Sequence, residues 1–354
     1  MNREQRIAGF LTEHGYDPAE ATPLAQDASF RRYLRLHGSA RAAILMDAPP
    51  PEDVRPFLRI ARHLADIGLS VPTIWAANEA AGLLIEEDLG DDLFPALLAP
   101  DPIRSEASSP ILVTPIPVPP VQDMPAPATL FAAAVDVLVA IQRAAPPFGL
   151  PAWGAAEMTQ TALGTLFDWW WPAAFGTPAP DQAKREVRDA LAEMLAPIAD
   201  DPRGFVHRDF FAGNLLWLPD RTGLRRVGVI DFQGAAIGHP AYDLVSLLQD
   251  ARRDIPETIE RDAIARYLAQ RPEIDPGRFR AAYAACAAQR HLRVACQWVR
   301  LAVRDHRPGY LAFGPRTWAL LHRALTHPAV TPLAAALDRW IPAAIRANPS
   351  GLSA

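Results

Sequence analysis

The sequence predicts an α+β fold with two lobes, a small N-terminal β-sheet lobe and a larger, mostly helical C-terminal lobe. Three observations support this prediction. Short β-like runs separated by turn residues surround one amphipathic helix before residue 90. Apolar residues recur with helical spacing from residue 129 onward. Between the two patterns, residues 99–128 are saturated with proline, which suits neither a helix nor a central strand.

The N-terminal lobe is expected to span residues 1–90. The runs SFRRYLRLH (29–37) and RAAILMD (41–47) are predicted to be strands paired around a Gly-Ser turn. Residues 52–67 have apolar spacing near 3.6 and are predicted to form a helix that ends at Gly68. Two further strands are predicted in VPTIWAAN and GLLIEED, and LGDDLF is a turn into a helix. The linker between the lobes is expected at 87–90.

The C-terminal lobe is expected to span 91–354, with 99–128 as an extended surface insertion. One β-like island, 215–231, is predicted to be a hairpin that turns at 220–223. The remaining periodic segments predict helices at 129–144, 157–171, 182–198, 241–252, 257–269, 277–304, 315–327 and 330–345.

Composition narrows the class of protein. Half of the 354 residues are hydrophobic and the formal charge is −5, so no basic excess suggests nucleic-acid binding. We expect no membrane span and no signal peptide, because the longest apolar runs are short and the N-terminus is polar. Cys286 and Cys296 would lie about 15 Å apart on one helix, too far for a disulfide. We therefore expect buried free thiols in a cytoplasmic protein. We also expect a monomer.

Three polar residues form the constellation that suggests a reaction. Asp209 and Asn214 lie in FVHRDFFAGNLLW, and Asp231 follows the apolar run Val227–Ile230 in VIDFQGAAIGHPAYDL. Phosphoryl transfer needs a carboxylate to orient and deprotonate the attacking hydroxyl. It also needs hard oxygen ligands that hold Mg²⁺ against a triphosphate. The spacing HRDxxxxN, followed by an apolar strand that ends in DF, matches the kinase arrangement of base and metal ligands.

Two features argue against a protein kinase. The segment from Asp231 to Asp243 is too short for an activation loop, and the N-terminal lobe has no GxGxxG. The motifs HRDFFAGNLL, VIDFQGAAIGHPAYDL and LIEEDLGD resemble the aminoglycoside phosphotransferase and choline-kinase-like superfamily, which has a bilobal protein-kinase-like fold. More narrowly, QDASFRRYLR, ILMDAPPPEDVRPF and QRHLRVACQWVRLAVRDHRPGYL resemble the anomeric N-acetylmuramate/N-acetylglucosamine kinases of cell-wall recycling.

This resemblance implies roles for individual residues and names ATP and Mg²⁺ as cofactors. Asp209 would be the catalytic base, and Asn214 and Asp231 would be the Mg²⁺ ligands. The linker around Glu87 and Leu89 would offer backbone groups to adenine. The turn that contains Ser29 would cover the phosphates.

One departure from the family pattern concerns the lysine that usually binds the α- and β-phosphates. The equivalent position lies near Met46, and the only lysine, Lys184, is in the other lobe. Arginine grips phosphate bidentately, so Arg31 or Arg32 is the expected replacement. Strand alternation places Arg32 on the apolar face, where a buried arginine needs an anionic partner. The alternative is a surface arginine, or one paired with Glu86.

The residues that bind the acceptor are harder to predict from the sequence. Trp170, in the cluster LFDWWWP, could stack on a sugar, although core packing is the commoner use of such a stripe. Arg290 or Arg293 could bind the lactyl carboxylate of N-acetylmuramate, or be ordinary helix residues. His239 could line the cleft. Asp243 is expected to order the loop before it.

The sequence therefore predicts an ATP-dependent kinase that phosphorylates the anomeric hydroxyl of N-acetylmuramate or N-acetylglucosamine. Two alternatives stay open. One is another small-molecule kinase of the superfamily, acting on an aminoglycoside, choline or another amine. The other is an inactive pseudokinase scaffold, which the missing lysine favours and the intact Asp209, Asn214 and Asp231 oppose.

Overall fold

The computed structural model describes residues 2–24, 31–38, 41–98, 124–199, 201 and 203–352. These residues form two compact units. The first unit takes its described residues from Met1–Leu98, Pro110–Val137 and Gly213–Gly234, and the second takes them from Leu138–Ala212 and Ala235–Ala354. Most of the proline-rich segment predicted as an extended insertion, residues 99–123, lies outside the described residues.

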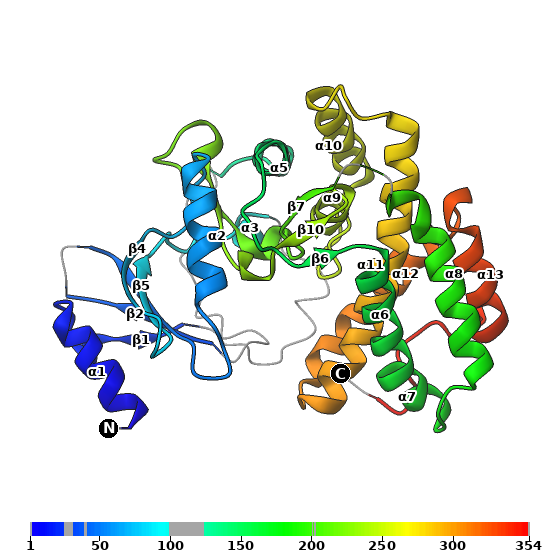
Figure 1. The fold of residues 1–354 in the computed structure, drawn as a ribbon, viewed down its shortest axis with the longest axis horizontal. Coiled ribbons are helices and arrows are strands. Elements are labelled where there is room, and N and C mark those ends of the chain that lie inside the picture. Colours follow the sequence, from blue (N-terminus) through cyan, green and yellow to red (C-terminus); the bar gives the residue numbers. More distant parts are fainter. Residues whose placement is uncertain are drawn as a thin grey trace. The chain divides into compact units, whose positions relative to one another are not determined.

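A five-stranded sheet is the centre of the first unit (Figure 1). Its order is β1-β2-β3-β5-β4, and all neighbouring strands are antiparallel. Four strands confirm the sequence prediction, whereas β1 was not predicted. The bounds are β1 Thr22–Pro23, β2 Arg32–Leu36, β3 Ala43–Asp47, β4 Ile74–Asn78 and β5 Leu83–Glu87.

Helix α1 (Arg3–Glu13) covers one face of this sheet, although its polar sequence gave no helix prediction. Asn2 caps it in a capping box with Gln5, which satisfies two backbone donors at the helix start. Its buried residues Ile7 and Phe10 pack against strands β3 and β5. The predicted helix α2 (Arg55–Asp66) lies beside β4, and the short α3 (Phe94–Leu97) follows β5 (Figure 1).

The predicted hairpin consists of β8 (Leu215–Trp217) and β9 (Val227–Val229). Backbone hydrogen bonds tie it to the first unit: Trp217 N–H donates to the Asp92 carbonyl (2.8 Å) and Val229 N–H to the Ser70 carbonyl (2.9 Å). These bonds explain why 213–234 groups with the sheet, whereas the sequence suggested one boundary near residue 90.

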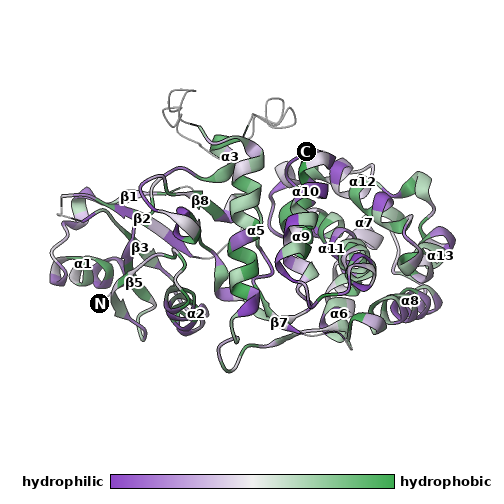
Figure 2. Cartoon of the chain, turned by 90° about the horizontal axis from the view of Figure 1, so that it is seen from above, coloured by the Kyte–Doolittle hydropathy of each residue, from purple (hydrophilic) through white to green (hydrophobic). Residues whose placement is uncertain are grey.

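The second unit is mainly helical, as predicted. Its central helix, α11, buries residues along most of its length and packs against α6, α8, α9 and α12. Helix α5, which the division between the units crosses, is largely apolar (Figure 2). The bounds are α5 Pro127–Arg143, α6 Ala155–Thr165, a π-helical turn Leu166–Trp170, α7 Trp171–Phe175, α8 Asp181–Ala199, α9 Ala241–Leu248, α10 Glu257–Gln270, α11 Pro276–Arg304, α12 Gly314–Leu325 and α13 Thr331–Trp340.

A small sheet in the second unit was not predicted. Strands β6 (Ala152–Trp153), β7 (Gly204–Val206) and β10 (Ala236–Gly238) pair in the order β6-β10-β7. Each is too short to give a periodic signal. Short 3₁₀ turns occur at Pro18–Glu20, Ala212–Asn214, Gly223–Arg226, Phe232–Gly234, Pro308–Phe313, Pro328–Val330 and Ala343–Ile345.

Two sequence expectations about single helices can be checked directly. Cys286 and Cys296 are both buried in α11 and both free, as predicted. Among the helices that the structure describes, none has the length and apolar character needed to cross a bilayer.

Candidate active site

The loop that contains Asp209 follows strand β7 and is held from below by Asp243. The buried carboxylate of Asp243 accepts hydrogen bonds from the backbone N–H of His207 (2.6 Å) and of Arg208 (2.8 Å). Arg208 also lies over the Trp153 ring, 3.9 Å from its centroid. Asp209 itself is exposed. These contacts agree with the structural role predicted for Asp243, and they leave the Asp209 carboxylate at the surface of its unit.

Burial raises the pKa of Asp243 to about 7, against the lowering effect of the two N–H donors and with a further rise from the nearby Asp209 charge. Asp209 and Asp243 are therefore electrostatic neighbours. Arg290 and Arg293 also interact with the Asp209 charge. The predicted base thus lies in a field that contains both carboxylates and guanidinium groups.

Backbone strain marks both predicted motifs. Among the described residues, the non-glycine positions with positive φ are Arg208 (75°), Asp231 (60°) and His306 (53°). A non-glycine residue in this region costs energy and persists only where its surroundings hold it, often at functional sites. Two of these three residues lie in the HRD and DFQ motifs.

Asn214 and Asp231 meet in the first unit, across the base of the hairpin. Ile230 N–H donates to the Asn214 carbonyl (3.1 Å), and Asn214 Nδ2 lies 3.4 Å from Asp231 Oδ2. Gln233 Nε2 donates to the other Asp231 oxygen (2.6 Å). The Asn214 amide oxygen and the Asp231 carboxylate are hard oxygen donors, which fit Mg²⁺ if phosphate and water supply the remaining ligands.

Metal binding by side chains alone is not favoured. The described part of the chain has no group of three or more His, Cys, Asp or Glu side chains that could hold a metal ion. Asp209 belongs to the second unit, whereas Asn214 and Asp231 belong to the first. Their cooperation in one reaction stays a prediction.

The two arginines considered for phosphate binding lie in different surroundings. Arg32 was expected to be buried on the apolar face, but its side chain is 48% exposed and is paired with Glu4 and with the fully buried Asp47. The burial prediction is wrong because Arg32 starts the strand, where the apolar face ends. Arg31 is the buried one, and it pairs with Glu52 at 2.9 Å.

Arg31 and the predicted metal ligand Asp231 both act on the charge of Tyr33. Burial raises the pKa of Tyr33; Glu86 and Asp231 raise it further, and Arg31 opposes them. These residues therefore share one electrostatic environment in the first unit. An arginine paired with a carboxylate just ahead of α2 is similar to the Lys–Glu pair of kinases. The geometry favours Arg31 over Arg32 as the replacement.

The remaining nucleotide candidates give a mixed result. Ser29 lies outside the described residues. The backbone N–H of Glu87 is used by the Thr73 carbonyl (2.8 Å), so it has no N–H to offer adenine. Leu89 lies close to the hairpin, and a Cβ at Gly228 would come within 3.2 Å of its side chain. A side chain at 228 would therefore crowd Leu89, Leu216 and Leu218.

Two substrate candidates belong to the protein interior. Trp170 is fully buried, donates from Nε1 to the Ala347 carbonyl (2.9 Å) and packs against Trp318, so the prediction that it stacks on substrate is wrong. His239 is buried and pairs with Asp201 at 3.3 Å. Its Nδ1 accepts from Ala241 N–H, and burial lowers its pKa. His239 therefore orders the start of α9 and does not line the cavity described next.

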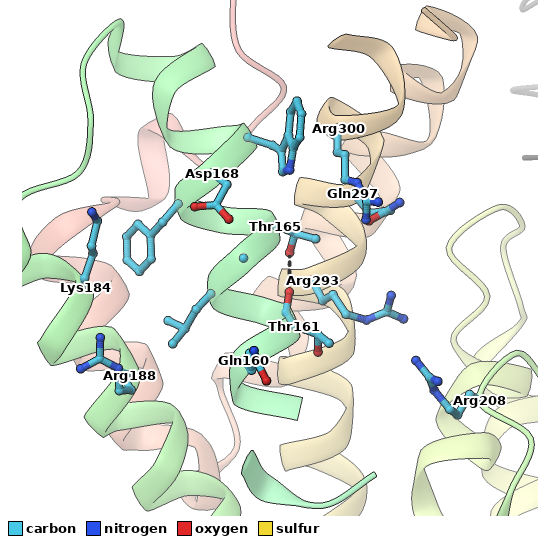
Figure 3. A pocket seen from close by; sticks show the side chains of 14 residues that line it. Gln160, Thr161, Thr165, Asp168, Lys184, Arg188, Arg208, Arg293, Gln297 and Arg300 are labelled. Atoms are coloured by element: carbon cyan, nitrogen blue, oxygen red, sulfur yellow. Dashed lines mark hydrogen bonds between the residues drawn. The ribbon is translucent and has the colours of Figure 1, made fainter. Parts of the chain in front are cut away.

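The second unit contains a cavity of about 830 Å³ (Figure 3). The face of α6 that carries Gln160, Thr161 and Thr165 lies between α8 on one side and α11 on the other (Figure 3), and Gly164 is also a lining residue. Arg293 lines it, as the substrate prediction requires, and Arg290 does not. Arg290 is buried and donates to Ser246 Oγ (2.8 Å). The charged lining residues are Lys184, Arg188, Arg208, Arg293, Arg300 and Asp168.

Sequence reasoning missed most of this lining. Arg293, Gln297 and Arg300 are spaced by four and three residues, which places them on one face of a helix, and this signal was available. Lys184 and Arg188 share the same spacing on α8. Trp169, not Trp170, lines the cavity. The π-helical turn at Leu166–Trp170 adds a residue to the helix and rotates the aromatic cluster by one position.

The family model described as the phosphotransferase enzyme family matches residues 20–283. This match covers most of the chain, and the chain therefore belongs to the phosphotransferase enzyme family. It is a kinase by class, and the predicted kinase-like fold is confirmed.

Two curated relatives are similar over most of their length. The N-acetylmuramate/N-acetylglucosamine kinase of Caulobacter vibrioides is 35% identical, covering 97% of this chain and 98% of that protein. The N-acetylmuramate/N-acetylglucosamine kinase of Pseudomonas aeruginosa is 31% identical, covering 87% and 84%. A solved structure of the aminoglycoside phosphotransferase APH(4)-Ia, in a ternary complex with ADP and hygromycin B, has a TM-score of 0.55 at 17% identity, covering 90% of this chain and 98% of that one.

Proposed function

We propose that the chain transfers the γ-phosphate of ATP to the anomeric hydroxyl of N-acetylmuramate or N-acetylglucosamine. The observation that carries the proposal is the similarity to the Caulobacter kinase over 97% of the chain, which leaves out neither unit. Use of ATP is supported by the ADP complex of the structural neighbour. The proposal also includes that the enzyme is cytoplasmic, acts as a monomer and takes part in cell-wall recycling.

In the reaction, the anomeric oxygen forms a bond to the γ-phosphorus while the bond to the β-γ bridging oxygen breaks, and ADP leaves. The Asp209 carboxylate orients the anomeric hydroxyl and accepts its proton. That hydroxyl is more acidic than an ordinary alcohol, so a base with a modest pKa suffices. The Asp243 carboxylate accepts hydrogen bonds from two backbone N–H groups of the loop that contains Asp209, and these bonds hold the loop in place.

The nucleotide side uses residues of the first unit. Asn214 and Asp231 would hold Mg²⁺, and Mg²⁺ would supply charge neutralisation at the phosphates. Arg31, already balanced by Glu52, would contact the phosphates in place of the missing lysine. Arg32 is the weaker candidate, because two carboxylates, Asp47 and Glu4, already hold its guanidinium.

The cavity lining distinguishes between acceptor classes. Five cationic side chains and one carboxylate surround it, which disfavours a cationic aminoglycoside or choline. The sugars of the proposal are neutral or anionic and fit this charge. The cavity therefore supports the amino-sugar acceptor over the amine acceptors of other superfamily kinases.

The test is Mg²⁺-dependent ADP release with N-acetylmuramate, N-acetylglucosamine, glucose, choline and kanamycin as separate acceptors. We expect release with the two N-acetyl sugars, and loss of it when the anomeric carbon is reduced to the alditol. Release with an amine alone would replace the acceptor class. Nucleotide binding without turnover on any acceptor would point to the pseudokinase alternative.

A further inference from the structure

The cavity over Gly164 carries a charge distribution that the reaction itself does not need. Arg208, Arg293 and Arg300 lie along one rim, beside α11, and Lys184 and Arg188 lie along the opposite rim, on α8 (Figure 3). Transfer to a neutral sugar would need no such excess of positive charge around the acceptor. The excess therefore calls for an anion in the cavity.

The α11 rim is the side on which this charge is least balanced. Within the part of the chain that the structure describes, neither Arg293 nor Arg300 forms an ion pair with a carboxylate. Arg293 donates to the Tyr242 hydroxyl (3.2 Å), and Arg300 donates to Gln297 Oε1 (3.3 Å). By contrast, Arg304, one turn further along the same helix, is paired with Asp305 at 2.7 Å.

Electrostatics supports the same distinction. Burial lowers the pKa of Arg300, and the nearby Arg304 and Arg293 charges lower it further, with only Asp305 opposing them. Two guanidinium groups that repel each other across one helical face lose that repulsion when an anion binds between them. Gln297, between them in sequence, adds an uncharged amide to the same face.

The cavity is open beside α6 because residue 164 is a glycine. A Cβ at this position would meet only Asp168 Oδ2, at 3.8 Å, which is ordinary contact. Glycine inside a helix costs about 1 kcal/mol relative to alanine, and no close backbone approach requires it here. The missing side chain leaves room beside α6, between the lining residues of α8 and those of α11.

We propose that this cavity is the acceptor pocket and that Arg293, Gln297 and Arg300 bind a carboxylate on the acceptor, so that the kinase selects the acidic sugar over the neutral one. The ligand class is an N-acetylated hexosamine with a carboxylate-bearing substituent. Arg293 also interacts with the Asp209 charge, so the carboxylate site adjoins the predicted base. This inference rests on the proposed function and adds the acceptor preference to it.

The experiment compares kcat/KM for N-acetylmuramate, its methyl ester and N-acetylglucosamine. The ester keeps the shape of the substituent and removes its charge. We expect the acid to be favoured over the ester by about 10- to 100-fold, the range of a charge-assisted hydrogen bond to a partly buried group. Equal values for acid and ester would overturn the carboxylate site while leaving the kinase activity established.

The matched variants are Arg300→Gln and Arg304→Gln. Arg300→Gln should remove most of the preference for acid over ester, by lowering kcat/KM for the acid far more than for the other two acceptors. Arg304→Gln, on the same helix but outside the cavity, should retain the preference. Equal losses on all three acceptors in Arg300→Gln would mean a general packing role. Loss of the preference in Lys184→Gln or Arg188→Gln, but not in Arg300→Gln, would overturn the assignment to the α11 rim.

Gly164→Leu tests the position of the pocket. The side chain would fill the room beside α6, and kcat/KM should fall for both sugars while nucleotide binding is kept. Gly9→Leu is the control, since Gly9 also lies inside a helix and a Cβ there meets no atom within 4 Å. Full activity in Gly164→Leu would show that the acceptor binds elsewhere. Absence of turnover on every acceptor in the wild-type enzyme would instead contradict the proposed function itself.

Discussion

The base of the hairpin in the first unit and the cavity in the second unit gather opposite charges in different ways. Asn214 and Asp231 come from the ends of one hairpin, 17 residues apart, and a backbone hydrogen bond from Ile230 to Asn214 brings those ends together. The cavity takes its cations from α8, the loop after β7 and α11, and α11 lies far from the other two elements in the sequence. The predicted oxygen ligands are thus brought together locally, whereas the cationic lining depends on the packing of α8, α11 and the loop after β7.

The difference shows why chemistry and specificity are unequally legible in a sequence. Phosphoryl transfer needs a base and metal ligands at fixed short spacings, so its residues stay in contiguous motifs. Acceptor recognition needs only a shaped, charged surface, which any set of packed helices can supply. Changes at the two sites should therefore separate turnover from acceptor choice.

Asp209→Asn should have the largest effect. Loss of the general base should lower kcat by about 10²- to 10⁴-fold, with nucleotide binding kept, because Asn preserves the size of the side chain. The measurement is ADP release alongside nucleotide titration. Turnover close to that of the wild type would show that Asp209 is not the general base, and the contrast between a catalytic site and an acceptor site would then lack its catalytic residue.

Trp170→Ala should separate scaffold from lining. Trp170 is fully buried against Trp318, so its removal should lower the free energy of unfolding by about 3–5 kcal/mol, as for other buried aromatic residues. Trp169→Ala is the matched control, since Trp169 is half-buried and lines the cavity. It should affect stability much less and acceptor KM more. Urea unfolding measures the stability and acceptor kinetics measure the KM. A larger change in acceptor KM in Trp170→Ala than in Trp169→Ala would mean that Trp170 contacts the substrate.

Trp169 and Trp170 also show where sequence reasoning ends. The aromatic cluster was visible, but the π-helical turn that selects which tryptophan faces the cavity depends on packing around α11. The hairpin, the main helices and four strands of the large sheet followed from periodicity and turn residues. Helix α1 did not, because its few apolar residues are spread among charged ones and become a face only against β3 and β5. Sequence spacing could predict which cations share one face of a helix, but it could not predict which helices pack together around the cavity.

Asp231→Ala should have an intermediate effect, which is confined to nucleotide binding at the base of the hairpin. Removing one of two oxygen donors should weaken Mg²⁺-dependent nucleotide binding by about 10- to 100-fold. Binding measured without Mg²⁺ should change little, because the metal no longer contributes in either protein. A loss of equal size with and without Mg²⁺ would indicate damage to the hairpin, and Asn214→Ala would then be the variant that decides between the two explanations.

A pH effect on stability is expected from Glu86, a buried carboxyl in the first unit near Arg31. Burial raises its pKa to about 8, with Arg31 partly opposing the rise, whereas an unfolded glutamate titrates near 4.3. The folded state therefore favours the protonated form. The stability that Glu86 contributes is fully present below the unfolded pKa and is lost as the pH rises through about 8. Between pH 5 and 8, the unfolding free energy of the wild type should therefore fall by on the order of 3–4 kcal/mol more than that of Glu86→Gln. Urea unfolding across this range measures the difference. If the two proteins lose unfolding free energy in parallel as the pH rises, Glu86 is ionised in the folded protein. Arg31 would then be balanced by two carboxylates, Glu52 and Glu86, and would be less suited to bind phosphate than its pair with Glu52 alone suggests.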